Sequence, residues 1–89
     1  MVIKAVITTI DNLSNNKEQL RVLSQDSLVD EIIVVNNGSI DGSREWLSTQ
    51  KDITLINRRN EGAGKGRNAG LDVAGEFDYI LMLDGGIRP

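Results

Sequence analysis

The sequence predicts a Rossmann-like α/β fold, and three observations support this prediction. Four short segments rich in Val, Ile and Leu alternate with segments whose apolar residues have helical spacing. The strand-like segments are almost continuously apolar, which is typical of parallel strands covered by helices on both faces. The connections between them are long enough for right-handed crossovers. We therefore expect a three-layer α/β/α domain with a mostly parallel four-stranded sheet, in the order β-α-β-α-β-α-β.

Each element is expected from a local pattern. Runs of β-branched and other apolar residues predict the strands, which we expect at residues 2–9, 31–35, 53–57 and 77–83. Helical spacing and cap residues predict three helices, which we expect from a cap among residues 14–16 to about 24, from Asp41 to about 49, and from about 65 to 74. Gly75 is a suitable residue to end the third helix, and residues 58–66 form a loop with three glycines.

Composition narrows the possible functions. Eighty-nine residues make one small domain, and a net charge of −3 without a dense basic block argues against a nucleic-acid binder. The chain has neither cysteine nor histidine, so acid–base or metal chemistry would fall to carboxylates. Its first apolar stretch is too short to span a membrane and lacks the features of a signal peptide, so we expect a cytoplasmic chain.

The stretch at residues 31–43, EIIVVNNGSIDGS, places polar residues directly after an apolar strand. In open α/β sheets, ligands bind at the carboxyl ends of the strands. The amides of Asn36 and Asn37 suit hydrogen bonds to the edge of a nucleobase. The same two residues are also typical of an Asx-turn that leads into the next helix, and both interpretations stay open.

Two charged residues point to phosphate chemistry. Arg67 lies one turn into the third helix, where an arginine can reach a phosphate held by backbone N–H groups. Asp84 follows the last apolar strand, and a carboxylate there can hold Mg²⁺ bridging to a diphosphate. Alternatively, Asp84 only starts an Asp-Gly turn.

A dinucleotide site is a further alternative. Gly64, Gly66 and Ala69 fit the pattern G-x-G-x-x-G/A, and Asp84 lies about twenty residues further on, where an acidic residue is expected. However, this stretch follows the third expected strand rather than the first, which argues against a dinucleotide-binding half-domain.

Four segments with their spacing together resemble the nucleotide-binding half of family 2 glycosyltransferases, which have the GT-A fold. The segments are AVITTID at 5–11, EIIVVNNGSIDGS at 31–43, NEG and RNAG within 60–70, and GEF and YILMLDGGIRP within 75–89. The first segment is similar to the end of that family's first strand, and the second to its motif E-I-I-V-V-D-[DN]-G-S-x-D-G-[ST]. The third is similar to its N-x-G followed by R-N-x-G, and the fourth to its D-x-D region. The resemblance covers essentially the whole chain.

The resemblance implies transfer of a sugar from a nucleotide-sugar donor to an acceptor, and a sheet with strand order 3-2-1-4. It implies that nucleotide binding involves Thr8 and Ile10 beside the base, Asn36 and Asn37 at the base and ribose, Arg67 near the diphosphate, and Asp84 as the first D-x-D carboxylate. A divalent cation, Mn²⁺ or Mg²⁺, is the implied cofactor. Gly86 stands at the second D-x-D position and has no side chain to ligate a metal, and Ile10 replaces the usual tyrosine.

The family's catalytic base and acceptor-binding half lie C-terminal to the matching segments. We therefore expect residues 1–89 to be a truncated donor-binding domain that binds nucleotides weakly and is inactive alone. Gly86 and the uncharged Asn36–Asn37 pair favour an alternative, a degenerate non-catalytic module of the same fold. We also expect self-association through an unprotected edge of the last strand.

Overall fold

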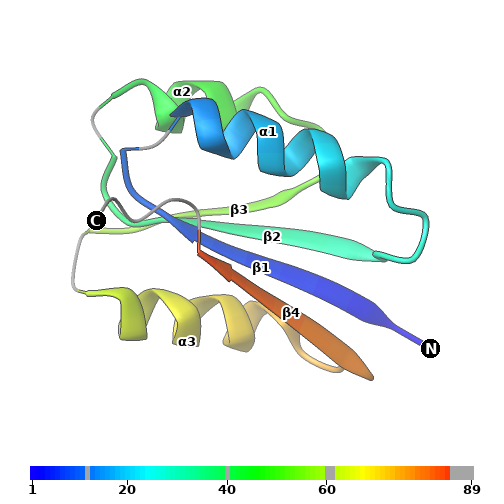
Figure 1. Ribbon diagram of the computed structural model, residues 1–89. Coiled ribbons are helices and arrows are strands. Elements are labelled where there is room, and N and C mark those ends of the chain that lie inside the picture. Colours follow the sequence, from blue (N-terminus) through cyan, green and yellow to red (C-terminus); the bar gives the residue numbers. More distant parts are fainter. Residues whose placement is uncertain (12, 40, 60–61, 85–89) are drawn as a thin grey trace.

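A computed structural model describes residues 1–11, 13–39, 41–59 and 62–84. One sheet is covered by two helices on one face and by a third helix on the other, which gives three layers (Figure 1). The elements in chain order are β1 (Ile3–Thr9), α1 (Leu13–Ser24), β2 (Glu31–Asn36), α2 (Ser43–Ser48), β3 (Thr54–Asn57), α3 (Ala63–Ala74) and β4 (Tyr79–Asp84).

The four strands are parallel and lie in the order β3-β2-β1-β4, which confirms the expected fold and strand order. The register pairs Thr8 of β1 with Val35 of β2 on one side and with Asp84 of β4 on the other. Because all strands are parallel, their carboxyl ends meet at one edge of the sheet, on the left of Figure 1. We call this the carboxyl edge.

Side chains alternate between the two faces of each strand, so the sheet has two core layers. The layer beneath α1 and α2 contains Ala5, Ile7, Leu20, Leu23, Ile32, Val34 and Leu47, with Trp46 packed against it. The layer above α3 contains Val6, Ile33, Val35 and Ala74. Full burial of an aliphatic side chain contributes about 1.5–3 kcal/mol, so the central strands β1 and β2 supply most of the stabilisation. Trp46 and Leu47 of α2 both face this first layer.

Two glycines allow α3 to approach the sheet closely. A Cβ atom at Gly70 would lie 2.5 Å from Cγ1 of Val6 and 3.2 Å from Cγ2 of Val35. A Cβ atom at Gly66 would lie 2.5 Å from Nδ2 of Asn37. The backbone of α3 therefore rests on β1 and β2, and its first turns lie against the residue that follows β2.

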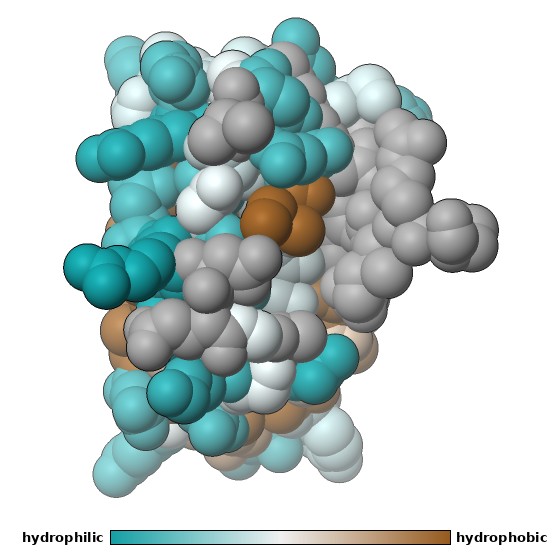
Figure 2. All heavy atoms as spheres, turned by 90° about the vertical axis from the view of Figure 1, so that its left-hand side faces the viewer, coloured by the Kyte–Doolittle hydropathy of each residue, from teal (hydrophilic) through white to brown (hydrophobic). Residues whose placement is uncertain are grey.

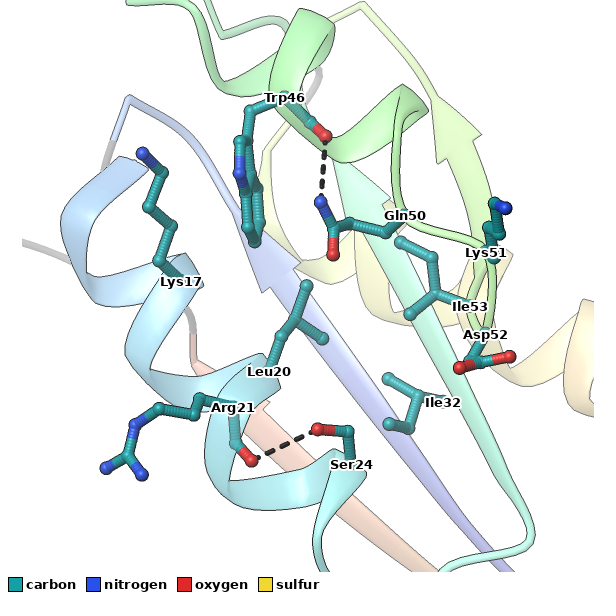
Figure 3. A pocket seen from close by; sticks show the side chains of 10 residues that line it. All are labelled: Lys17, Leu20, Arg21, Ser24, Ile32, Trp46, Gln50, Lys51, Asp52 and Ile53. Carbon is teal, nitrogen blue, oxygen red and sulfur yellow. Dashed lines mark hydrogen bonds between the residues drawn. The ribbon is translucent and has the colours of Figure 1, made fainter.

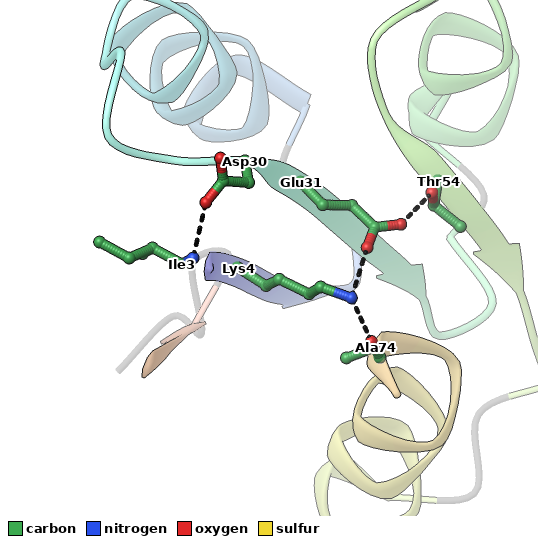
Figure 4. A network of polar contacts seen from close by, with 6 residues as sticks. All are labelled: Ile3, Lys4, Asp30, Glu31, Thr54 and Ala74. Atoms are coloured by element: carbon green, nitrogen blue, oxygen red, sulfur yellow. Dashed lines mark hydrogen bonds and ion pairs between the residues drawn. The ribbon is translucent and has the colours of Figure 1, made fainter. Parts of the chain in front are cut away.

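A polar network fixes the opposite, amino edge of the sheet (Figure 4). Nζ of Lys4 lies 3.2 Å from Oε1 of Glu31 and also donates to the carbonyl oxygen of Ala74 at the end of α3. Oγ1 of Thr54 donates to Oε2 of Glu31 at 3.0 Å. The network therefore joins β1, β2, β3 and the end of α3.

Several expected boundaries are wrong by a few residues. The first helix begins at Leu13, before the expected cap, whereas β3 and β4 begin later than expected, at Thr54 and Tyr79. The third helix begins at Ala63, so Gly64 and Gly66 belong to its first turns and not to a preceding loop. Gly66 is typical of a loop in the sequence, yet it lies inside the helix, where an added Cβ atom would displace the side chain of Asn37.

The expected cap of the second helix is also wrong. Gly42, with φ of 95°, is the N-cap residue of α2, and it makes no side-chain capping bond. Oδ1 of Asp41 instead accepts a hydrogen bond from the backbone N–H of Ser43 at 2.9 Å. Asp41 thus shapes the turn before α2 with an Asx-type bond. In the part of the chain that the structure describes, no helix is long and apolar enough to cross a membrane.

Candidate functional site

The residues just beyond β1, β2 and β3 are held side by side at the carboxyl edge. The backbone N–H of Asn37 donates to the carbonyl oxygen of Thr9 at 2.9 Å, and that of Arg58 donates to the carbonyl oxygen of Asn36 at 2.8 Å. Figure 2 views the molecule from this side and shows a mainly hydrophilic surface with a small hydrophobic patch near its centre. The edge is therefore a polar surface built by successive strand ends.

Thr8, Ile10 and Asp84 lie at the β1–β4 side of this edge. Thr8 is buried, and its Cα atom is paired in the parallel ladder with that of Asp84, the last residue of β4. Ile10 follows β1 directly and is half-buried. Gly86, the expected second metal position, lies outside the described residues. The structure thus brings the backbones of Thr8 and Asp84 together.

The side chain of Asn36 is buried and hydrogen-bonded to neighbouring residues. It is 1% exposed, and its Nδ2 donates to Oδ1 of Asn57 at 3.0 Å. Its Oδ1 accepts from the backbone N–H of Ser39 at 3.2 Å and from the hydroxyl of Ser39. These bonds are those of an Asx-type turn, and they also tie the end of β2 to the end of β3. The side chain of Asn36 therefore has a structural role at the carboxyl edge.

Asn37 lies on the other face of the sheet, against the first turns of α3. It is 7% exposed, and its side-chain amide makes no hydrogen bond to any residue that the structure describes. Arg67 follows Gly66 on α3 and is exposed. The contact between Gly66 and Asn37 therefore brings Arg67 and Asn37 to the same part of the edge.

A pocket of about 400 Å³ lies at the ends of β2 and β3 and was not expected from the sequence. Six of the residues that line it are Asn36, Ser39, Arg44, Asn57, Arg58 and Arg59. Nη1 of Arg58 donates to the carbonyl oxygen of Lys65 at 3.0 Å, which holds this arginine between β3 and α3. The pair Arg58-Arg59 directly after an expected strand was a sequence signal for this site, since Asn37 follows β2 in the same way.

The candidate metal site depends on one carboxylate predicted from the sequence, that of Asp84. Among residues 1–11, 13–39, 41–59 and 62–84, no group of three or more acidic side chains is gathered in a way that could hold a metal ion. Asp84 is the carboxylate that would bind Mn²⁺ or Mg²⁺, since Gly86 cannot ligate. Metal binding at Asp84 stays a prediction.

A second pocket, of about 250 Å³, lies between α1, α2 and the turn before β3 (Figure 3). Leu20, Ile32 and Ile53 contribute its apolar lining, and Nζ of Lys17 lies 5.5 Å from the ring centroid of Trp46. This pocket shares no described residue with the pocket at the ends of β2 and β3.

One ion pair near the second pocket is exposed to solvent. The Arg21 guanidinium hydrogen-bonds Glu18 and lowers the pKa of its carboxyl group, and the same bond raises the pKa of Arg21. Because both groups are exposed, this pair stabilises α1 only slightly.

Comparison with known proteins identifies the family of the chain. Residues 6–85 match the sequence model of the family described as glycosyl transferase family 2. The chain is 34% identical over 90 residues to "Putative glycosyltransferase EpsH" of Bacillus subtilis (strain 168). This match covers 96% of the chain and 26% of that relative, so the chain spans about a quarter of the relative's length. The chain belongs to glycosyl transferase family 2.

Proposed function

We propose that this chain is the donor-binding part of a glycosyltransferase and that it binds a nucleotide-sugar at the carboxyl edge. The observation that carries the proposal is the contact between Gly66 and Asn37. It places the start of α3 against the ends of β1 and β2, where backbone N–H groups of the helix can meet a phosphate. The membership of the chain in glycosyl transferase family 2 supports a nucleotide-sugar as the ligand.

Each predicted residue has a distinct role in this proposal. The amide of Asn37 recognises the base or ribose, because it faces the edge without a hydrogen-bond partner among the described residues. Arg67 binds the diphosphate, and Thr8 and Ile10 form the floor beside the nucleotide. Asn36 positions the turn at Ser39 and the end of β3 through its own hydrogen bonds.

Asp84 would hold the divalent cation, which supplies charge neutralisation at the leaving diphosphate when it is bound. Sugar transfer also needs a general base for the acceptor hydroxyl and a second wall for the donor. We assign neither role to residues 1–89. The 89-residue chain is therefore proposed to bind the donor without catalysing transfer.

Calorimetric titration of the chain with uridine and guanosine diphosphates, with and without Mn²⁺, tests this proposal. We expect nucleotide binding that Asn37→Ala and Arg67→Gln each weaken by about tenfold, the effect of losing one charged or well-aligned hydrogen bond. Arg21→Gln is the matched control, because Arg21 is an exposed arginine on α1. Binding of NAD without binding of either nucleoside diphosphate would refute the proposal.

The metal role needs variants of its own. Asp84→Asn is expected to abolish any gain in nucleotide affinity from Mn²⁺, and Gly86→Asp is expected to increase that gain. No change in either variant would show that the cation does not bind at these positions.

A second candidate is a non-catalytic module that keeps the fold without nucleotide binding. The internal hydrogen bonds of Asn36 favour it, because they explain this residue without a ligand. The absence of nucleotide binding in the same titration, with the fold intact by circular dichroism, would support this candidate.

A further inference from the structure

The pocket at the ends of β2 and β3 has no role in the proposed donor binding. It brings together three arginines from separate parts of the chain, since Arg44 lies in α2 whereas Arg58 and Arg59 follow β3. The described residues that line it include no carboxylate. Arg44 and Arg59 make no ion pair with any described residue. The chain as a whole carries a net charge of −3, so this concentration of positive charge is local.

The floor of the pocket is neutral and fixed. The side chains of Asn36 and Asn57 are hydrogen-bonded to each other, and Oδ1 of Asn36 also accepts from Ser39. The backbone N–H of Arg58 donates to the carbonyl oxygen of Asn36, and its guanidinium donates to the carbonyl oxygen of Lys65. The pocket therefore has a hydrogen-bonded polar floor. Arg58 is held in place by its bond to Lys65, whereas Arg44 and Arg59 are exposed.

This arrangement suits a phosphate group better than a carboxylate. Guanidinium groups bind phosphate oxygens through paired N–H donors. A phosphate monoester carries a charge of about −1.5 to −2 at neutral pH, whereas a carboxylate carries a single charge. Arg44 and Arg59, which make no ion pair with a described residue, supply two positive charges that match the larger charge.

The arginines of the pocket and Asp84 lie at different parts of the carboxyl edge, because Arg58 and Arg59 follow β3 whereas Asp84 ends β4. Two strands, β2 and β1, lie between β3 and β4 in the sheet. Neighbouring strands are about 4.8 Å apart, so the ends of β3 and β4 are separated by roughly 14 Å. A ligand in the pocket would therefore bring a second phosphate group to the carboxyl edge.

We propose that Arg44, Arg58 and Arg59 form a phosphate-binding subsite, distinct from the position of the donor diphosphate near Thr8 and Asp84. The proposal rests on the proposed function only where it distinguishes this subsite from a donor site. Its phosphate binding is argued from its own residues. Its ligand is a phosphate monoester on a second molecule or free inorganic phosphate.

Titration of the chain with inorganic phosphate and with glycerol 3-phosphate, followed by calorimetry and by amide chemical shifts, tests the subsite. We expect at least one of these probes to bind, with shifts centred on Gly38, Ser39 and Arg59. The double variant Arg44→Gln/Arg59→Gln is expected to weaken this binding by about tenfold or more. Both arginines are exposed, so the variant should keep the fold. A preference for glycerol 3-phosphate would identify a monoester, and a preference for inorganic phosphate would identify the free ion.

Two controls separate this proposal from donor binding. Arg21→Gln should leave phosphate affinity unchanged, and Arg67→Gln should weaken uridine diphosphate but not phosphate. Phosphate should also bind to chain already saturated with uridine diphosphate. Phosphate binding that depends on Arg44 and Arg59 in a chain that binds no nucleotide would keep the subsite and refute the proposed function. Equal phosphate affinity in the wild type and the double variant, or no binding of either probe, would overturn the subsite.

Discussion

Asn36 and Asn37 show how two identical neighbouring residues acquire different roles. Because side chains alternate along a strand, Asn36 lies on the same face as Ile32 and Val34, towards α1 and α2. Asn37 lies on the face covered by α3, against Gly66. Asn36 is engaged in hydrogen bonds to Asn57 and Ser39, whereas the side-chain amide of Asn37 makes none with a described residue. Only one of the two amides is therefore proposed to recognise a ligand.

Replacement of Gly66 by alanine tests the position of Asn37. The added Cβ would lie 2.5 Å from Nδ2 and 3.0 Å from Oδ1 of Asn37, so the amide must move. We expect the affinity for uridine diphosphate to fall about tenfold, as it does for loss of one hydrogen bond. Stability should change by less than about 1 kcal/mol, because the higher helix propensity of alanine offsets the displacement. Titration and urea denaturation measure the two effects.

Two other glycines of α3 are matched controls. A Cβ atom added at Gly64 would meet no neighbouring atom within 4 Å, so Gly64→Ala should stabilise the chain by up to about 1 kcal/mol with unchanged affinity. A Cβ at Gly70 would lie 2.5 Å from Cγ1 of Val6, so Gly70→Ala should cost about 1–3 kcal/mol through overpacking. Wild-type affinity in Gly66→Ala would show that the placement of Asn37 does not matter for binding.

At the scale of elements, α3 is held to the sheet near both of its ends. Gly66 lies against Asn37 near its start, Gly70 lies against Val6 and Val35 further along, and Lys4 binds the carbonyl oxygen of Ala74 at its end. Lys4 also pairs with Glu31, which accepts a hydrogen bond from Thr54. The amino-edge network therefore fixes the helix whose other end forms the proposed donor site.

Lys4→Met is expected to destabilise the chain by about 1–3 kcal/mol. The substitution removes a charged donor from Glu31 and from the end of α3, and it leaves both acceptors partly buried without that partner. The methionine stem replaces much of the apolar contact of the lysine chain. Urea denaturation measures the change, with Lys51→Met as the control because Lys51 is exposed. A change no larger than the roughly 0.5 kcal/mol expected for a surface control would contradict the structural role of Lys4.

The sequence predicted the elements well because their periodicity follows directly from burial. Four apolar runs predicted the strands and helical spacing predicted the three helices, whereas the strand order was predicted from the resemblance to family 2 glycosyltransferases. The start of α3 was placed about two residues too late, because the three glycines within residues 58–66 are typical of a loop. The residues at the strand ends could be predicted in the same way, whereas Arg44 could not. It reaches the pocket only because α2 packs beside the end of β3.

Across the whole molecule, charge is distributed unevenly between the two edges of the sheet. Arg44, Arg58, Arg59, Lys65 and Arg67 lie at or near the carboxyl edge, and they are half of the chain's ten Lys and Arg residues. The turns at the amino edge carry a set of acidic residues, Asp26, Asp30, Asp52, Glu76 and Asp78. Asp11, Asp41, Glu45 and Asp84 also lie at or near the carboxyl edge, so the charges along that edge are mixed. The positive charge is concentrated at the pocket lined by Arg44, Arg58 and Arg59, where attraction of an anionic ligand should weaken as salt is added.

The outer edge of β4 determines how the 89-residue chain is expected to behave in solution. β4 lies at one end of the sheet, so one side of its backbone has no neighbouring strand within the described chain. Its apolar side chains are unusually accessible, with Tyr79 61%, Leu81 43% and Met82 39% exposed. The other edge strand, β3, has four residues against six in β4 and offers a shorter pairing surface. An exposed, apolar edge strand is a template for pairing with another chain.

We expect reversible self-association of the chain through β4, and Leu81→Lys should shift it towards the monomer. A lysine on an edge strand opposes pairing because two copies would bring like charges together and bury them. Sedimentation velocity over a range of protein concentrations measures the effect. Val22→Lys is the matched control, since Val22 is 53% exposed on α1 and lies away from the sheet edge. It should leave the association unchanged, because β4 keeps its apolar edge. A wild-type chain that stays monomeric at high concentration, or an equal response to both lysine substitutions, would show that β4 is not the associating surface.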